Sequence, residues 1–600
     1  MKFNNRTILS SIFATALLWL LPVAIHAAPP SQANVEKASK AGDFSGALSI
    51  LNSWLNDQVP AKPADAALMA LIADPAFANA LARRQLISKI GADKLAAFAK
   101  ADAANQAFLE WLLGNTSAMN LYLEAAVPLG LAAREKNAYT LDPASLQIWQ
   151  QILKADPDAK DGIYQKLAIA TALRPPGCVN IGAGGAATPA DPVARYRYFK
   201  TAHQKKELFP SFDRLTVWEF SKILCSGASD ADLTWARQMI NSFRPDLRAD
   251  ELVVNSTSFV WRRGAPAVFY PNGGYQNFQN VLAGGGKCGP RSSWSVMVCH
   301  AFGIPAIGVG QPAHACVAYK AANPMTQPQP GSAWKVAYGA GWDKSTIDDT
   351  PYDKLKGPDF LAGIEKRSDA AKFSQVEHLR WLAGAVTPPE KAAAVMGVAQ
   401  KIHDSITLPK TDITASHKAD EAEADPGVKA AAKAGAPKVP GAISVNPSAT
   451  TSKAASGVIH VEAAAFAKTG GKISWGGQIP NVLVHDSFGG GKQAYFQQQM
   501  KEQWADYTIE VPTAGTYQIT MKAACINDDQ LLEVSSGNKV VAAVPIPLVP
   551  GAFGLWQDTK PVELKLEKGT QTIRVQTPVS VNAENHKRGI ALRFFELKSK

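Results

Sequence analysis

Apolar residues in the first part of the chain recur three or four positions apart, which is the spacing of one face of an α-helix. These segments are rich in alanine and leucine, and proline residues fall between them. Examples are residues 45–54, 66–74, 93–108 and 145–153. Asp142–Pro143 and Asp156–Pro157 are predicted helix starts, because proline is tolerated in the first turn. The pattern therefore predicts a helical domain over residues 33–250.

The last part of the chain has a different period. From residue 458 to residue 600, short runs alternate between apolar and polar positions, and turns of Pro, Gly and Asn separate them. This pattern is typical of an antiparallel β-sandwich, here expected to be jelly-roll-like. The predicted strands are Val458–Glu462, Ala505–Val511, Gly515–Met521, Leu532–Val534, Val562–Leu566, Gln571–Val575 and Ile590–Leu597.

Residues 251–408 combine both patterns. A run of glycines, Gly284–Gly286, leads to Cys288, and a helix is predicted from Arg291 to Ala301. An apolar strand and a second strand that begins at His314 follow. Helices over residues 373–383 and 390–407 end this region. We therefore expect an α+β core with trailing helices between the helical domain and the sandwich.

Two further segments complete the domain plan. Residues 1–27 have the features of a secretory signal, with Lys2 and Arg6 before the apolar stretch Ile8–Val23 and with Ala27 or Ala28 before the cleavage point. Ser10, Ser11 and Pro22 interrupt the stretch, so a retained membrane anchor is less expected. Residues 409–457 are rich in Ala, Lys, Pro, Ser and Thr and contain no aromatic residue, which predicts a disordered linker. We expect an exported protein, periplasmic or extracellular, with no transmembrane anchor after cleavage.

Charge adds little to this plan. The net charge is +11, and removal of Lys2 and Arg6 leaves 11 − 2 = +9, without a dense block of basic residues. Such a balance permits attraction to anionic wall or membrane surfaces, but it is also common for plain solubility. We therefore expect no nucleic-acid partner.

The residues around Cys288 have the chemistry of a nucleophilic site. A thiol at a helix N-terminus meets free backbone N–H groups and the positive end of the helix dipole, and both favour the reactive thiolate. A histidine on a neighbouring strand can complete an ion pair with that thiolate and can move protons. Cys288 is therefore the candidate nucleophile, and His314 is the candidate general base and acid.

The order of these motifs also resembles the transglutaminase-like superfamily. The matching blocks are the glycine run with Cys288, the Gly303–Ile304–Pro305 turn and the His314 strand, over roughly residues 265–350. The resemblance implies an α+β papain-like core, a Cys-His-Asp triad, and acyl transfer or amide hydrolysis without a cofactor. A protein or peptide substrate, for example a cell-wall peptide, is the partner that it implies.

The third member of the triad departs from the family pattern. The family usually has an aspartate four residues after a tryptophan, whereas Trp334 is followed at that distance by Tyr338. The nearest carboxylate is Asp343, which we take as the candidate third residue. If Tyr338 lies behind His314 instead, the imidazole lacks an anionic partner and activity is reduced or absent.

The six cysteines leave the disulfide pairing open, since connectivity is not readable from sequence. An oxidising compartment permits a Cys178–Cys225 bridge in the helical region. Cys299 and Cys316 are expected to be buried thiols, with a bridge between them as the alternative. Upstream, Gln276 and Gln279 are candidate oxyanion donors by proximity alone, but surface or turn glutamines are commoner.

The predicted sandwich resembles carbohydrate-binding modules similar to families 6 and 35. Trp504–Tyr507, the Val511–Tyr517 segment and the later strand pair carry the likeness. The resemblance implies a sugar stacked on two aromatic rings, at positions matched by Tyr495 and Trp556. It also implies a calcium site at Glu462, but no second ligand is well placed, so no metal is predicted. The alternative is that both aromatic residues belong to the core.

Two classes of function follow from these motifs. The favoured one is an exported cysteine enzyme, a protease, amidase or acyltransferase, which a glycan-binding module tethers to its surroundings. The alternative is a catalytically degenerate scaffold, or a carbohydrate- or wall-binding protein, whose working part is the C-terminal domain.

Overall fold

The computed structural model describes most of the chain. The described residues are 32–130, 139–176, 190–249, 253–260, 277–286, 288–311, 314–320, 334–337, 342–347, 355–408, 454–455, 457–473, 481–496, 500–527, 530–549, 551–578 and 589–600. The predicted signal segment, Cys178, Gln276, Tyr338 and nearly all of the predicted linker lie outside these ranges.

Helices form the first part of the structure, as the sequence predicts. Their bounds are α1 Gln32–Lys40, α2 Phe44–Gln58, α3 Asp65–Ala73, α4 Pro75–Ile90, α5 Ala92–Ala101, α6 Ala103–Gly114, α7 Thr116–Ala125, α9 Ala144–Ala155, η1 Pro157–Lys160, α10 Gly162–Leu173, α11 Pro192–Gln204, η2 Pro210–Arg214, α12 Val217–Leu224, α13 Asp230–Phe243, α14 Asp246–Ala249 and η3 Val253–Phe259. Among the described residues no single helix is long and apolar enough to span a membrane; only α3 and α4 together meet that test, across an 82° bend.

Capping side chains set many helix starts. Asp102 accepts a hydrogen bond from the Ala104 backbone N–H, so the stretch predicted as one helix over residues 93–108 is divided into α5 and α6. At the start of α9 the N-cap residue is Pro143, and the side chain of the preceding Asp142 accepts a hydrogen bond from Ala144 N–H at 2.9 Å. Asp156 instead begins a single turn of 3₁₀ helix, η1.

The central region contains a helix packed on a small sheet. Its elements are α15 Asn277–Gly284, α16 Cys288–Ala301, β1 Ala306–Gln311, β2 His314–Lys320, β3 Trp334–Ala337, η4 Trp342–Lys344, β4 Thr346–Ile347, β5 Leu355–Lys356, α17 Gly357–Lys366, α18 Ala370–Ala383 and α19 Pro389–Asp404. Strands β1, β2 and β3 form an antiparallel sheet in that order, and α16 packs against β1 and β2. A papain-like core as a whole stays a prediction.

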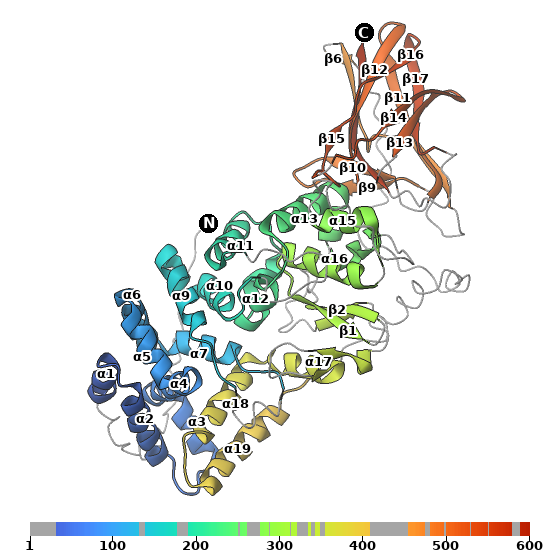
Figure 1. The fold of residues 1–600 in the computed structure, drawn as a ribbon. Coiled ribbons are helices and arrows are strands. Elements are labelled where there is room, and N and C mark those ends of the chain that lie inside the picture. Colours follow the sequence, from blue (N-terminus) through green and yellow to red (C-terminus); the bar gives the residue numbers. More distant parts are fainter. Residues whose placement is uncertain are drawn as a thin grey trace, which may run out of the picture.

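The two trailing helices do not stay beside this sheet. α18 packs on α3 and α4, and α19 packs on α18, so residues far apart in sequence share one core (Figure 1). The Arg84 guanidinium donates to the Gly384 carbonyl, and the Lys391 ammonium donates to Asn56. The described trailing helices are therefore part of the helical body.

The C-terminal region is an antiparallel β-sandwich. Its strands are β6 Ala454–Ala455, β7 Val458–Glu462, β8 Lys468–Ile473, β9 Leu483–Asp486, β10 Lys492–Phe496, β11 Met500–Val511, β12 Gly515–Cys525, β13 Leu531–Ser536, β14 Lys539–Pro545, β15 Gln557–Asp558, β16 Val562–Leu566, β17 Gly569–Gln576 and β18 Ile590–Ser599. One described sheet has the order β14-β13-β17-β11-β8, and the other is built on β15-β12-β18-β10-β9 with β7 and β16 also paired. All seven predicted strands are present.

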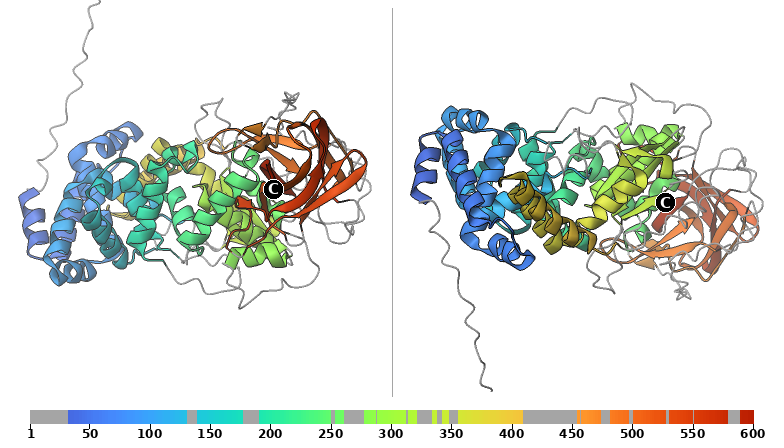
Figure 2. Two further views of the ribbon diagram at one scale, coloured as in Figure 1. Left: turned by 90° about the horizontal axis from the view of Figure 1, so that it is seen from above. Right: turned by 90° about the horizontal axis from the view of Figure 1, so that it is seen from below.

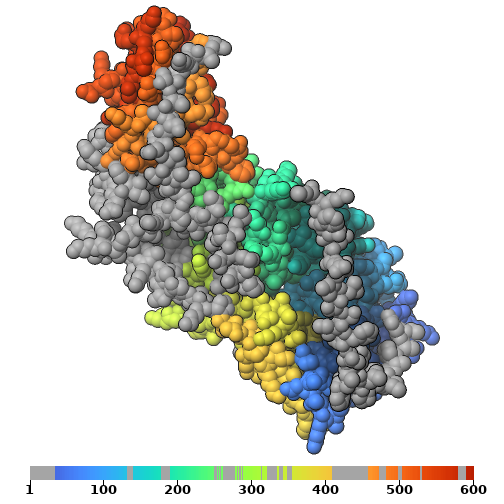
Figure 3. All heavy atoms as spheres, turned by 180° about the vertical axis from the view of Figure 1, so that it is seen from behind, coloured from blue at the N-terminus to red at the C-terminus, as the bar shows by residue number. Residues whose placement is uncertain are grey.

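One end of the sandwich docks on the helical body. Figure 1 shows β9 and β10 next to α13 and α15, and Figure 2 places the sandwich at the opposite end of the molecule from α1 and α2. The space-filling view shows the same lobe at one end of the body (Figure 3). Apolar residues of this end, including Tyr495, Phe553 and Ala591, belong to the same buried cluster as the helical core.

Candidate functional site

The candidate nucleophile is the first residue of α16. Cys288 is partly exposed, whereas the other described cysteines, Cys225, Cys299, Cys316 and Cys525, are buried. Helix α16 is 14 residues long, so its first turn provides backbone N–H groups and the positive end of its dipole. Among the described cysteines, Cys288 is therefore the one that combines partial exposure with a position at a helix N-terminus.

Helix α16 and strand β1 are antiparallel neighbours joined by the short turn at Gly303–Pro305. A Cβ placed on Gly308 would lie 3.9 Å from Val296, so the middle of the strand faces the middle of the helix. The 14-residue helix is about 21 Å long and the six-residue strand spans about 17 Å, so they are matched in length. The N-terminus of α16 and the far end of β1 consequently lie at the same end of this unit.

His314 lies at that end, because it pairs with Gln311, the last residue of β1. Along β2, Val317 packs in the cluster that contains the core of α16, whereas Cys316 and Ala318 pack in a cluster on the other face, with Trp334 and Trp342. By the two-residue alternation of a strand, His314 is on the face of Cys316, which is opposite the face that α16 covers. His314 and Cys288 therefore share one end of this unit but not one face of the sheet.

The segment that carries Asp343 meets the sheet on that same face. The Gln311 side chain donates from Nε2 to Ser345 Oγ at 3.1 Å and to the Cys316 sulfur at 3.3 Å. Ser345 is two residues beyond Asp343, which is itself exposed in η4. The fold thus brings the Asp343 segment beside the His314 strand end.

No hydrogen bond joins the Cys288 thiol to the His314 imidazole in the part of the chain that the structure describes. The triad of Cys288, His314 and Asp343 stays a prediction, and the alternative third residue, Tyr338, lies outside the described residues.

The alternative of a Cys299–Cys316 bridge is wrong for this structure. Cys299 is a free thiol in the interior of α16, on the opposite side of the sheet from the cluster that contains Cys316. Burial raises the pKa of the Cys299 thiol far above its ordinary value. The expectation of two buried thiols is confirmed. A Cys178–Cys225 bridge stays a prediction, because Cys178 lies outside the described residues.

The sequence did not reveal the position of Gln279. This fully buried side chain in α15 accepts a hydrogen bond at Oε1 from the Gly551 backbone N–H, at 2.9 Å. A role in docking the sandwich therefore accounts for Gln279 better than the candidate role as an oxyanion donor. In the sequence, Gln279 was a candidate only because it lies close to the glycine-rich segment before Cys288. That position does not distinguish a docking role from a role as oxyanion donor.

Tyr495, one of the two predicted sugar-stacking residues, is only 2% exposed. Its ring packs edge-to-face on Phe243, with centroids 5.5 Å apart, and lies 4.9 Å from the Arg244 guanidinium. A Cβ on Gly589 would lie 2.3 Å from the Tyr495 hydroxyl, so β18 also approaches closely. With the sandwich docked, the ring has no open face for a sugar, and the predicted stacking role is not supported by this geometry.

Trp556, the second predicted residue, is partly buried against the main core. It follows a loop that contacts α13, where the Trp235 indole N–H donates to the Phe553 carbonyl at 2.9 Å. An open pocket of about 390 Å³ lies at this junction, lined by Tyr198, Asp230, Ala231, Thr234, Trp235, Gln238, Gly551 and Leu555.

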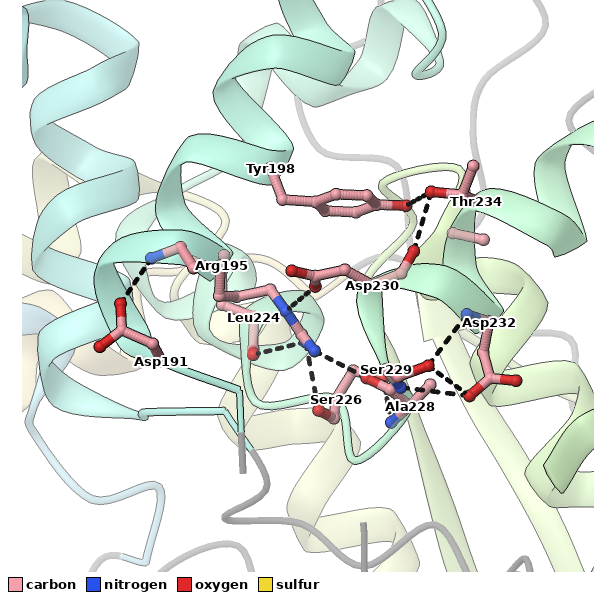
Figure 4. Close-up of polar contacts among 12 residues, drawn as sticks. Asp191, Arg195, Tyr198, Leu224, Ser226, Ala228, Ser229, Asp230, Asp232 and Thr234 are labelled. Atoms are coloured by element: carbon pink, nitrogen blue, oxygen red, sulfur yellow. Dashed lines mark hydrogen bonds and ion pairs between the residues drawn. The ribbon is translucent and has the colours of Figure 1, made fainter. Parts of the chain in front are cut away.

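A hydrogen-bond network holds the polar wall of this junction pocket (Figure 4). The Arg195 guanidinium is 1% exposed and donates to Asp230 Oδ1 at 2.6 Å and to three backbone carbonyls. Thr234 donates to the Asp230 carbonyl at 2.8 Å and contacts the Tyr198 hydroxyl at 3.1 Å. Burial raises the pKa of Tyr198, so this hydroxyl keeps its proton at neutral pH.

Within the described residues, no three His, Cys, Asp or Glu side chains are grouped as metal ligands would be. Glu462, the residue that a calcium site would use, accepts a hydrogen bond from His460 Nε2 at 3.2 Å instead. Burial alone would lower the pKa of His460, but Glu596 and Glu462 together raise it above its ordinary value.

Comparisons with known proteins concern the C-terminal region. No protein-family model matches the chain, and no curated protein matches it. Among solved structures, the C-terminal region resembles carbohydrate-binding modules of families 6 and 35. The module CsCBM6-3 from Clostridium stercorarium in complex with cellobiose is 14% identical, covers 25% of this chain and 98% of its own, and has a TM-score of 0.20.

Two further modules have similar values. A β-1,3-glucan-binding family 6 module from Bacillus halodurans is 14% identical, with 25% of this chain and 100% of that chain covered and a TM-score of 0.20. A family 35 module from Clostridium thermocellum is 12% identical, with 24% and 98% covered and a TM-score of 0.18. These likenesses concern the fold of the sandwich and assign it no ligand.

Proposed function

We propose that the α16–β1–β2 unit is a thiol site for acyl transfer or amide hydrolysis, with Cys288 as nucleophile and His314 as its proton carrier. The observation that carries this proposal is the placement of Cys288. It alone among the described cysteines is partly exposed, and it begins a helix that packs on the strand pair ending at His314.

The reaction follows from the two groups. The Cys288 thiolate attacks an amide carbonyl carbon, the C–N bond breaks, and the amine leaves with a proton from the imidazole of His314. A thioester remains on the sulfur. Water then releases the acid, or a second amine takes the acyl group and forms a new amide. The resemblance to transglutaminase-like enzymes supports a protein or peptide substrate, including cell-wall peptide, at an exported location.

The test is the rate of thiol alkylation by iodoacetamide over pH, measured by mass spectrometry on the full chain. One thiol is expected to react much faster than the others, and Cys288→Ala should remove this fast phase. Cys299→Ala is the matched control, because it removes a buried thiol from the same helix and should leave the fast phase unchanged.

His314→Ala separates a catalytic pair from a thiol activated by its helix alone. If the imidazole assists the thiol, this variant slows the fast phase of alkylation. Slow and equal alkylation of all thiols would overturn the proposal and favour the degenerate scaffold. An unchanged fast phase in His314→Ala would remove His314 from the site.

A second function has its own observation, the junction pocket between α13 and the loop at residues 551–555. We propose that this pocket binds a glycan, because it combines the Asp230 carboxylate and the Gln238 amide with the half-buried Tyr198 ring. The Arg237 guanidinium lies 5.0 Å from that ring and occupies one of its faces, so a sugar would use the other face. Sugars offer apolar C–H faces and hydroxyl groups, and such mixed linings suit them. The glycan would be held by the helical body and the sandwich together.

Calorimetric titration of the full chain with soluble cello- and laminari-oligosaccharides tests this second proposal. Binding should weaken at least tenfold in Tyr198→Leu and in Gln238→Ala. Tyr164→Leu, which changes a comparably half-buried tyrosine on α10, should bind as the unaltered chain does. No binding, or equal weakening by Tyr164→Leu, would contradict a site at the junction.

A further inference from the structure

A second pocket lies at the opposite end of the molecule, among α1, α2, α4, α5 and α6. Its volume is about 380 Å³. Apolar side chains, among them Phe44, Leu109 and Leu113, form part of its lining. Neither proposed function uses this pocket.

One side chain of this lining is unusual. Arg83, in α4, is only 6% exposed, yet its hydrogen bond is made through Nε alone, to the Leu113 carbonyl at 2.7 Å. Within the described residues, neither terminal nitrogen of Arg83 has a hydrogen-bond acceptor. Burial lowers the pKa of Arg83, and Glu36, the acidic residue that offsets this effect, forms no ion pair with it. The terminal nitrogens of Arg83 thus have no protein acceptor among the described residues, and they are not sealed from solvent, so they can be reached from the pocket.

Two other buried arginines have protein acceptors for their terminal nitrogens. Arg84, the next residue of α4, is 7% exposed and donates to Asn52, Gln85 and the Gly384 carbonyl. Arg195 is 1% exposed and uses three nitrogens in four hydrogen bonds. A buried charge costs free energy unless acceptors surround it, so the open positions on Arg83 favour an acceptor from outside the chain.

We propose that this pocket binds an organic carboxylate, with the carboxylate on the Arg83 guanidinium and the apolar part of the ligand against Phe44 and Leu109. A guanidinium fork matches the two oxygens of a carboxylate in geometry and charge. The apolar lining requires carbon atoms next to that carboxylate. The volume is at the small end of ligand pockets, which suits a small acid or the last residues of a peptide.

The charges of the lining decide between a monoanion and a dianion. Arg83, Lys40 and Lys100 are positive, and Glu36 and Glu110 are negative, so the five charged lining residues sum to 3 − 2 = +1. One carboxylate neutralises this sum, whereas a phosphate dianion would leave an excess negative charge beside two glutamates. The ligand is therefore a monocarboxylate.

Calorimetric titration of the full chain with matched acid and amide pairs tests the proposal. The probes are hexanoate against hexanamide, and an acetylated Ala-Ala-Leu peptide with a free C-terminus against its C-terminal amide. At least one acid should bind, and its amide should bind about tenfold or more weakly, because the charge-assisted bond is lost. Which acid binds distinguishes a free acid from a peptide end.

Two variants locate the site. Arg83→Met should abolish binding and leave the melting temperature unchanged or higher, because it removes a poorly partnered buried charge. Arg84→Met is the matched control, because it breaks satisfied bonds in the same helix; it should lower the melting temperature and keep acid binding. Equal binding of acid and amide, tighter binding of inorganic phosphate, no binding of any probe, or unchanged binding in Arg83→Met would each overturn the proposal.

Discussion

Asp246 lies at the junction between the sandwich and the helical body, and we expect the free energy of unfolding to depend strongly on its charge. Its two carboxylate oxygens accept hydrogen bonds from Arg244, from Nε at 2.8 Å and from a terminal nitrogen at 2.7 Å. The pair is largely buried, with side-chain exposures of 15% for Arg244 and 4% for Asp246. The Arg244 guanidinium in turn lies 4.9 Å from the ring of Tyr495 on the sandwich.

The substitution Asp246→Asn keeps the shape and removes the charge. Burial alone would raise the pKa of Asp246, but the bonds from Arg244 hold it below its ordinary value, so the carboxylate is charged at neutral pH. Removing one partner of a buried ion pair costs about 3–5 kcal/mol, because the other charge stays buried. The asparagine still offers one oxygen acceptor, so we expect a loss near 3 kcal/mol in the free energy of unfolding, at the low end of that range.

Urea unfolding followed by tryptophan fluorescence measures this loss, with hydrogen exchange over residues 241–249 to locate it. Asp558→Asn is the control, because it makes the same change in an exposed pair with Lys522, at 3.0 Å and with an Asp558 exposure of 71%. Such exposed pairs contribute at most about 1 kcal/mol.

A double variant separates the lost pair from other effects of the substitution. If the cost arises from the unpaired cation, Arg244→Met combined with Asp246→Asn should be less destabilised than the sum of the two single variants. Additive effects, or an Asp246→Asn loss no larger than that of Asp558→Asn, would refute the reasoning that this buried pair stabilises the junction.

Three further outcomes are expected. Burial lowers the pKa of Lys89 to about 8, so the unfolded chain binds this proton more tightly than the folded chain does. The free energy of unfolding, measured by urea titration, should therefore rise between about pH 8 and pH 10. Lys89→Met should flatten that rise, and a free energy that falls over this range would contradict the prediction. Tyr495→Ala should cost about 3–5 kcal/mol without weakening glycan binding, whereas selective loss of binding would restore its stacking role. Gly554→Val should weaken docking of the sandwich on α13, because φ at this position is +69° and a Cβ would lie 2.3 Å from Met239 Cγ. Hydrogen exchange of α13 measures this effect. Unchanged exchange would show that the loop adapts.

Local pattern predicted the elements well, because it records which side of each element is buried. The alternation in Val458–Glu462 and Val562–Leu566 gave the bounds of β7 and β16 as the structure has them. Apolar residues at helical spacing likewise predicted α2, α3 and α9 to within a few residues of their ends. The prediction of one helix over residues 93–108 missed the break at Asp102. The Asp102 side chain ends one helix and starts the next through its own local hydrogen bonds, and these leave the spacing of apolar residues unchanged.

The sequence pattern shows which face of a helix or strand is buried, but it does not show which other element packs on that face. Nothing near Gly384 or Lys391 in the sequence indicates that α18 and α19 contact the first helices, since those contacts join residues 300 and 335 positions apart. The same limit explains Tyr495. Aromatic residues at a loop edge suit either a sugar or a docking surface, and only the position of Phe243 and Arg244 distinguishes them.

The docking of the sandwich also concerns the thiol site, because helix α15 both contacts the sandwich and leads to Cys288 in the chain. Gln279 lies in α15 and accepts its hydrogen bond from Gly551 of the sandwich, and α15 ends at Gly284, four residues before Cys288. A chain that loses the docked sandwich also loses the partner that fixes α15. The loop of the C-terminal region at residues 551–555 therefore supports the helix that leads to the candidate nucleophile.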